Sequence, residues 1–237
     1  MKNTKFYLQA AMLLLPAFLS AQNVIPEPTQ YRPAKGQFVL TAAETKAFEA
    51  QDVLPGRVVQ CVISGSTPMD ADEAYHLKIT PDSVFIQSAT ATGAFRGKET
   101  LKQLLRSGKG TAKACVINDA PRYAWRGFML DESRHFFGKK KVKQLLDIMA
   151  SLRLNVFHWH LTDEPGWRIE IKKYPLLTQI GAKGNWHDPD APATFYTQDD
   201  IKEIVAYAAA RHIMVVPEFD MPGHATAACR AYPELSG

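Results

Sequence analysis

Carboxylates, histidines and arginines gather around the ends of three apolar segments of the sequence. The stretch VVPEFDMPGH begins as a buried strand would and ends in Glu218, Asp220 and His224. The other two segments offer a comparable set: Arg126, Asp131, Glu132, Arg134, His135, His158, His160, Asp163 and Glu164. Such residues around one cleft can bind several sugar hydroxyls. Paired carboxyl groups can also perform acid–base catalysis when their environments separate their pKa values. The sequence therefore favours one active site shared by the three segments.

The tripeptide His-Trp-His in the second segment allows a different chemistry. His158 and His160 are two residues apart, so in a strand they lie on the same side. A His-x-His pair on a barrel strand can bind zinc, which would make the protein a metal-dependent hydrolase. No second ligand pair follows at metal-binding spacing. We therefore favour one histidine hydrogen-bonded in the core and the other facing the cleft, and we expect no metal.

The elements that would position these residues alternate between strand and helix from Pro121 onward. Residues 139–154 have apolar side chains at helical spacing, as in an amphipathic helix. A second helix follows Thr197, which with Asp200 forms the pattern of a capping box. Strands that alternate with helices in this way pair in parallel through right-handed crossovers.

The three strands are apolar until their carboxyl ends, which is typical of a (β/α)₈ barrel with its chemistry on that face. A doubly wound sheet has the same rhythm but commonly carries a glycine-rich first turn, and the turn DESRHFFGKK lacks one. We therefore predict an α/β fold in which residues 121–237 form a partial (β/α)₈ barrel of about three strands. A small α+β domain at residues 22–120 precedes it.

The predicted small domain contains short strands and one clear helix. Residues 22–35 resemble an extended lead-in, and residues 74–80 and 83–89 alternate as the two strands of a hairpin. The next helix ends at Gly108. We find no catalytic cluster in this domain.

The first 21 residues have the pattern of a secretory signal peptide. Lys2 and Lys5 precede an apolar run that ends at Leu19, and a small-residue cleavage site follows. The run is too short to span a bilayer comfortably, and Gln22 stands where a lipid-anchored protein would have cysteine. We predict a protein exported to the periplasm or the medium, with no membrane anchor.

The composition points to an ordinary globular protein. Of the 237 residues, 46% are hydrophobic and 22% are charged, and the formal net charge is +4. Without residues 1–21 that charge falls to +2, and no basic stripe is present, so nucleic acid is not an expected partner. Cys61 and Cys115 could form a disulfide in an oxidising compartment, but we favour three buried free thiols, with Cys229 as the third.

Four long motifs of the second region together resemble family 20 glycoside hydrolases, the exo-acting β-N-acetylhexosaminidases. They are PRYAWRGFMLDESRHFF, LRLNVFHWHLTDEPGWRIEIKKYP, YTQDDIKEIVAYAAARHIMVVPEFDMPGH and AYPEL. The resemblance implies a substrate with a terminal N-acetylhexosamine and a retaining mechanism. The substrate's own acetamido oxygen attacks the anomeric carbon, without a metal or organic cofactor.

The resemblance also implies roles for single residues. Arg126 matches the arginine that grips the outer hydroxyls of the terminal sugar, since a guanidinium suits two neighbouring oxygens. His160 and Asp163 match polar positions near the floor of the cleft. Asp220 and His224 match a pair that supports the catalytic acid. In this pair His224 lies near the acid, and Asp220 fixes the orientation of the His224 ring.

In the family, the catalytic acid and its partner lie in a His-x-Gly-Gly-Asp-Glu motif beyond the third strand. The sequence ends at Gly237 without this motif, whereas a complete barrel needs about 250 residues. We therefore interpret it as the N-terminal part of a longer enzyme or the product of a truncated gene, and expect the chain alone to be inactive. A metal-dependent hydrolase and a non-catalytic sugar-binding protein remain the alternatives.

Overall fold

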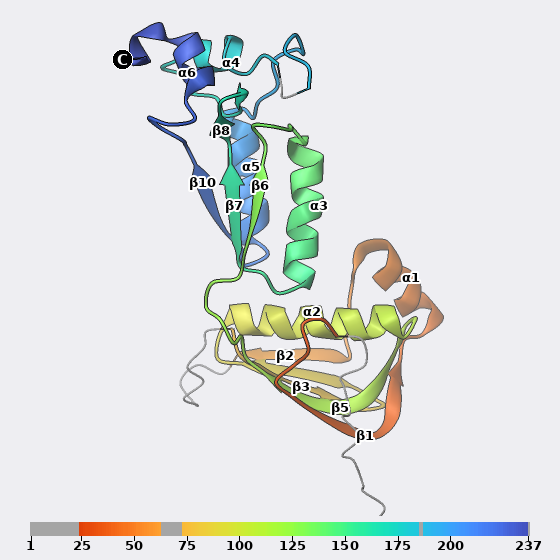
Figure 1. The fold of residues 1–237 in the computed structure, drawn as a ribbon. Coiled ribbons are helices and arrows are strands. Elements are labelled where there is room, and N and C mark those ends of the chain that lie inside the picture. Colours follow the sequence, from red (N-terminus) through yellow and green to blue (C-terminus); the bar gives the residue numbers. More distant parts are fainter. Residues whose placement is uncertain (1–23, 63–72, 185–186, 237) are drawn as a thin grey trace, which may run out of the picture.

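The computed structural model describes residues 24–62, 73–184 and 187–236, which form two domains stacked end to end (Figure 1). The predicted signal peptide lies outside these residues. No helix in the described ranges combines the length and the apolar character needed to cross a bilayer.

The first domain is a five-stranded sheet with one face covered by a long helix, α2 (Figure 1). The strand order is β1-β5-β3-β4-β2. The elements are β1 (Gln30–Val39), α1 (Ala42–Gln51), β2 (Val58–Val62), β3 (Tyr75–Ile79), β4 (Val84–Ser88), α2 (Ala91–Ser107) and β5 (Thr111–Asp119). Side chains of the sheet, such as Leu77 and Ile86, form one core with Leu101 and Leu105 of α2.

The predicted hairpin is confirmed, because β3 and β4 pair antiparallel with Leu77 opposite Ile86. The predicted extended conformation of the lead-in is confirmed for residues 30–35, which belong to β1. Its proline, Pro33, is tolerated because β1 is an edge strand and its register shifts between Pro33 and Gln37. Helix α1 is an addition to the sequence prediction, and it begins with a capping box in which Thr41 and Glu44 bond to each other's backbone amides.

The second domain contains three parallel strands in the order β10-β7-β6, with two helices packed on one face. The elements are β6 (Gly127–Asp131), α3 (Gly138–Ser151), β7 (Val156–His160), α5 (Gln198–Ala209) and β10 (Met214–Glu218). This order confirms the predicted strand–helix alternation and its parallel pairing. Helix α5 starts at the predicted capping box of Thr197 and Asp200.

The register of the parallel sheet sorts its side chains between two faces. Phe157 and Trp159 of β7 are fully buried in the core formed with the helices. His158 and His160 alternate with them and therefore lie on the opposite face, as the sequence predicted. Asp131 and Glu218 flank His160 in the pairing of the three strands. The carboxyl ends of the strands therefore bring these three side chains to one level.

The long segment between β7 and α5 folds over the carboxyl end of the sheet. It contains a two-stranded hairpin, β8 (Thr162–Asp163) and β9 (Gly166–Trp167), and the short helix α4 (Leu176–Gln179). After β10 come α6 (Thr226–Ala231) and a 3₁₀ turn, η1 (Pro233–Leu235), and α6 packs against α4. These elements surround the strand ends that carry the candidate site (Figure 1).

The three cysteines are free thiols in the structure. Cys61 is exposed, Cys115 is buried and Cys229 is partly buried, so the interpretation of three free thiols is confirmed except for their uniform burial. Burial raises the pKa of Cys115 to about 11, which makes this thiol unreactive at neutral pH.

Candidate active site

An open pocket of about 580 Å³ lies at the carboxyl ends of β7 and β10. The residues that line it are Arg134, His160, Asp163, Glu218, Phe219, Asp220, Met221, Gly223 and His224. The structure thus brings together four of the five site residues selected from the sequence, and the exception is Arg126.

Asp163 is the buried centre of this pocket. Its side chain is only 1% exposed, and it bonds to the partly exposed Arg134 and the exposed His224. Oδ2 is 2.6 Å from Nη2 of Arg134, and Oδ1 is 3.0 Å from Nδ1 of His224. Because Asp163 engages Nδ1, the other ring nitrogen of His224, Nε2, is the one that can exchange a proton with a group in the pocket.

His160 and Asp220 form a second pair beside the first. Nε2 of His160 is 3.1 Å from Oδ2 of Asp220, and the Asp220 amide donates to the hydroxyl of Thr162 at 2.9 Å. The sequence interpretation that Asp220 fixes the ring of His224 is therefore corrected, because Asp163 has that position. The chain turns after Asp220, and His224, with φ at 55°, contacts Asp163 of β8.

Arg134 is the arginine that the structure places in the pocket. Its guanidinium bridges Asp131, at 2.6 Å, and Asp163, and its side chain is 38% exposed. Burial alone would raise the pKa of Asp131, but hydrogen bonds and charge from Arg134 outweigh it and lower that pKa. The sequence places Arg134 among the polar residues that follow the first apolar segment, but the resemblance assigned the sugar-binding role to Arg126 instead.

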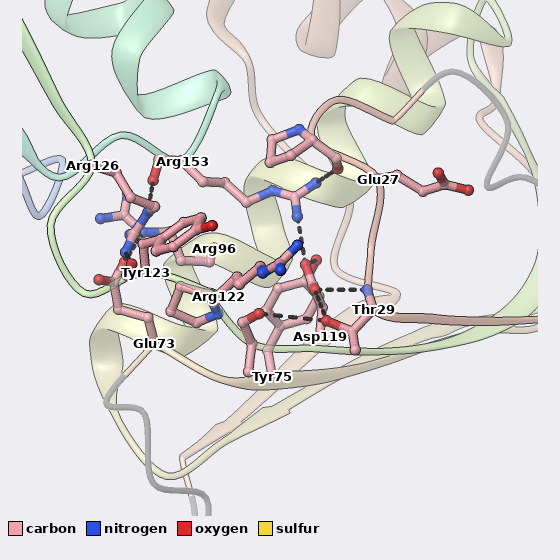
Figure 2. Close-up of a pocket in the computed structure, with 13 residues that line it drawn as sticks. Glu27, Thr29, Glu73, Tyr75, Arg96, Asp119, Arg122, Tyr123, Arg126 and Arg153 are labelled. Atoms are coloured by element: carbon pink, nitrogen blue, oxygen red, sulfur yellow. Dashed lines mark hydrogen bonds and ion pairs between the residues drawn. The ribbon is translucent and has the colours of Figure 1, made fainter.

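Arg126 lies at the opposite end of β6, which corrects its predicted contact with sugar in this pocket. It precedes Gly127, the first residue of β6, and lines a separate cavity of about 360 Å³ between the two domains (Figure 2). Its guanidinium bonds to the carboxylate of Glu73 at 2.5 Å and to the carbonyls of Tyr123 and Arg153. A residue that starts a strand cannot reach chemistry at the end of that strand.

The zinc interpretation requires His158 and His160 to act together. Nε2 of His158 is instead 2.5 Å from a carboxylate oxygen of Glu218, while His160 bonds to Asp220. Three groups of described side chains lie close enough to hold a metal ion, and none of them contains His158. His160, the more buried of the two, therefore lines the pocket, whereas the more exposed His158 lies outside the pocket lining, so the predicted division between a core histidine and a cleft histidine is corrected.

A buried framework supports the loop that carries Asp131 and Arg134. The Arg168 guanidinium is fully buried and donates to five backbone carbonyls, including those of Glu132 and Ser133. The Glu132 carboxylate accepts from the Tyr196 hydroxyl at 2.7 Å and from a backbone amide. Burial raises the pKa of Glu132 despite these hydrogen bonds.

The fold and the site define a parallel (β/α)-barrel domain with acid–base groups at its carboxyl face, the arrangement of barrel enzymes. Comparison with known families makes the assignment specific. The family model described as "Glycosyl hydrolase family 20, catalytic domain" matches residues 123–237, and "Glycosyl hydrolase family 20, domain 2" matches residues 45–120. The chain belongs to glycosyl hydrolase family 20.

Its relatives agree with this assignment. The chain is 34% identical to a beta-hexosaminidase of Porphyromonas gingivalis, covering 96% of this chain and 34% of that protein. It is 37% identical to a beta-hexosaminidase of Vibrio furnissii, covering 90% and 39%. The structure of Streptomyces plicatus N-acetyl-beta-hexosaminidase in complex with Thio-NAglucal superposes with a TM-score of 0.79 at 35% identity, covering 90% and 49%. The chain therefore spans between a third and two fifths of these two curated relatives.

Proposed function

We propose that the whole protein is an exo-acting β-N-acetylhexosaminidase that removes terminal N-acetylglucosamine or N-acetylgalactosamine from glycans. The observation that carries the proposal is the linked pair of contacts from buried Asp163 to Arg134 and His224 in the pocket. A relative from Vibrio harveyi, with a TM-score of 0.77 and 31% identity, is described as an exo beta-N-acetylglucosaminidase in complex with N-acetylglucosamine.

Each group of the pocket has a role in this proposal. The exposed guanidinium of Arg134 binds neighbouring hydroxyls of the terminal sugar, because it presents several donors in one plane. His224, held at Nδ1 by Asp163, contacts the catalytic glutamic acid through Nε2 and tunes its protonation. That acid protonates the leaving oxygen while the substrate's acetamido oxygen attacks the anomeric carbon. Water then opens the cyclic intermediate with retention of configuration.

We further propose that the protein is exported and that its reaction requires no metal. The basic and apolar pattern of residues 1–21 supports export. In the pocket, Asp163 and His160 already bond to other side chains, which would compete with a metal ion for the same oxygen and nitrogen atoms. The partner of the protein is then a carbohydrate, either in the periplasm or in the medium.

The test uses the protein purified from its native cells together with the 237-residue chain produced alone. We expect the native protein to lack residues 1–21 by intact mass and to hydrolyse an aryl N-acetyl-β-glucosaminide, with or without a chelator. The matched aryl β-glucoside should remain intact, because it lacks the attacking acetamido group. The 237-residue chain should release no product, since its sequence contains no His-x-Gly-Gly-Asp-Glu motif.

Three results would contradict parts of the proposal. Equal hydrolysis of the glucoside would exclude substrate assistance, and loss of activity with the chelator would favour the metal-dependent alternative. Turnover by the 237-residue chain would show that the catalytic acid lies within residues 1–237.

A further inference from the structure

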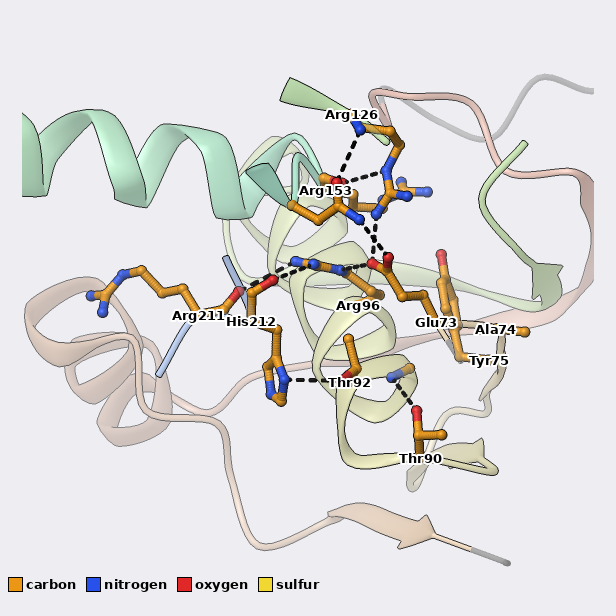
Figure 3. Close-up of polar contacts among 12 residues, drawn as sticks. Glu73, Ala74, Tyr75, Thr90, Thr92, Arg96, Arg126, Arg153, Arg211 and His212 are labelled. Carbon is orange, nitrogen blue, oxygen red and sulfur yellow. Dashed lines mark hydrogen bonds and ion pairs between the residues drawn. The ribbon is translucent and has the colours of Figure 1, made fainter. Parts of the chain in front are cut away.

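A cluster of charged groups joins the two domains at the amino ends of all three parallel strands. We call it the interdomain clasp. It consists of Glu73, Arg96, Arg126 and the backbone of residues 211–212 (Figure 3), together with Asn155, which bonds to Glu73. Glu73 and Arg96 come from the small domain and the others from the barrel domain. The clasp lies at the opposite end of the strands from the candidate active site.

Glu73 connects the small domain to the first two strands. Its carboxylate is 2.6 Å from Nε of Arg96, 2.5 Å from Nη2 of Arg126 and 3.0 Å from Nδ2 of Asn155. Arg126 immediately precedes β6, and Asn155 immediately precedes β7. One carboxylate therefore holds the starts of both strands.

Arg96 connects the small domain to the third strand. This residue of α2 is 1% exposed, and its Nη2 donates to the carbonyl of His212 at 2.9 Å, two residues before β10. Its Nη1 lies 3.4 Å from the carbonyl of Arg211. The hydroxyl of Thr92, one turn earlier on α2, lies 3.0 Å from Nδ1 of His212. Helix α2 therefore fixes the loop that leads into β10.

Backbone hydrogen bonds complete the alignment of the three strand starts. The Asn155 amide donates to the carbonyl of Arg126 at 3.0 Å, and the Met214 amide donates to the carbonyl of Asn155 at 2.9 Å. Neighbouring parallel strands that are fixed at their starts are also fixed in register at their ends. The clasp thus lies at the starts of the strands whose register sets the relative heights of His160 and Glu218 in the pocket and of Asp131 beside it.

Several polar side chains that line the cavity beside the clasp bond to one another (Figure 2). Arg153, which follows α3, pairs with Asp119 at the end of β5 and donates to the carbonyl of Pro26. The Tyr75 hydroxyl also donates to Asp119, at 2.9 Å. The contacts of Arg153 with Asp119 and Pro26 cross between the domains, so they join the domains a second time.

We propose that Glu73 and Arg96 are positioning residues for the active site, and that the small domain serves to align the three strands that carry it. Breaking a buried ion pair leaves an uncompensated charge, so one substitution should loosen all three strands together. The inference does not require the proposed glycosidase activity, because it concerns the geometry of the pocket.

The test compares Glu73→Gln with Glu44→Gln in the whole protein. Glu44 pairs with Arg57 at 2.7 Å within the small domain, so it is a matched ion pair that does not cross between domains. Hydrogen exchange of peptides from β6, β7 and β10 reports strand opening, and the ring proton signals of His160 and His224 report pocket geometry. Asn155→Ala, a milder change, serves as a second variant if Glu73→Gln does not fold.

We expect Glu73→Gln to accelerate exchange about tenfold or more in all three strands and to shift both histidine signals. Asn155→Ala should have the same effects, more weakly, in β6 and β7. Glu44→Gln should affect α1 and β2 alone. Faster exchange with unmoved histidine signals would overturn the positioning role, as would an effect of Glu73→Gln confined to the small domain. Because no readout requires turnover, failure here is distinct from failure of the proposed function.

Discussion

Asp163 determines the geometry of the pocket at the scale of single residues. Its oxygens hold Arg134 on one side and His224 on the other, and they do so from a fully buried position. A hydrogen bond to a buried carboxylate is stronger than one between neutral groups and fixes which ring nitrogen of a histidine carries the proton. The two exposed side chains that would meet a substrate therefore depend on one buried partner.

Substituting Asp163 by asparagine should weaken its contacts with Arg134 and His224 without preventing the protein from folding. The amide retains one acceptor oxygen, so either Arg134 or His224 loses its partner. In the active protein we expect kcat to fall about 10²-fold or more, the usual contribution of a positioned acid–base group. Asp199→Asn, on an exposed surface of α5, is the matched control and should leave kcat unchanged. Steady-state kinetics measure both variants, and an unchanged kcat in Asp163→Asn would contradict this role of Asp163.

At the scale of elements, the β8–β9 hairpin joins the site to the rest of the domain. Gly166, in this hairpin, lies directly against the buried guanidinium of Arg168. A Cβ at this position would lie 2.4 Å from the guanidinium carbon, and Arg168 is held by the carbonyls around it. The hydroxyl of Ser133 also donates to the Gly166 carbonyl at 2.7 Å, which links the hairpin to the loop after β6. Only glycine fits without displacing this framework.

Gly166→Ala should therefore destabilise the chain by overpacking. We expect the free energy of unfolding to fall by about 1–3 kcal/mol, as measured by urea denaturation. Gly56→Ala is the matched control, because a Cβ at Gly56 would meet no atom within 4 Å. Its effect should stay within about 0.5 kcal/mol. Equal effects of the two substitutions would show that Arg168 can move.

At the scale of the whole molecule, the hydrogen bonds and ion pairs of the clasp connect the small domain to the barrel domain. Its charged side chains are Glu73, Arg96 and Arg126, and the titratable ring of His212 lies beside them, close enough to feel the charge of Arg96. Burial alone would raise the pKa of Glu73, but hydrogen bonds from Arg126 and Arg96 outweigh it and lower that pKa below its ordinary 4.5. Burial and the charge of Arg96 lower the pKa of His212 below 6.5.

These directions predict that acid uncouples the domains. A group whose pKa is depressed by folding contributes stability above its unfolded pKa, and this contribution is lost as the pH falls through the folded value. The His212 contribution should therefore decline below pH 6.5, and that of Glu73 below pH 4.5. Hydrogen exchange of β6, β7 and β10, corrected for intrinsic rates, should therefore be faster in acid. The increase should be smaller in Glu73→Gln. An identical pH dependence in both proteins would contradict this assignment.

Much of the fold could be predicted because its signals are local. Helix α5 is marked by Thr197 and Asp200, the hairpin of β3 and β4 by alternation, and the parallel strands by apolar runs that end in polar groups. Strand β1 was harder, because Pro33 argues against a strand unless the edge position and the bulge are known. Helix α1 had a visible capping signal at Thr41 and Glu44, but its ten residues bury only Phe48 and show no apolar face.

The sequence by itself determined the family, the parallel pairing of the strands and the residue types gathered at their carboxyl ends, because motif order and hydrophobic spacing are properties of the chain. Only the tertiary structure decided which partners meet. It paired His224 with Asp163 and His160 with Asp220, and it placed Arg134 in the pocket and Arg126 in the clasp. Hydrogen bonds depend on distances between atoms that lie far apart in sequence, and those distances exist only after strands and domains have packed.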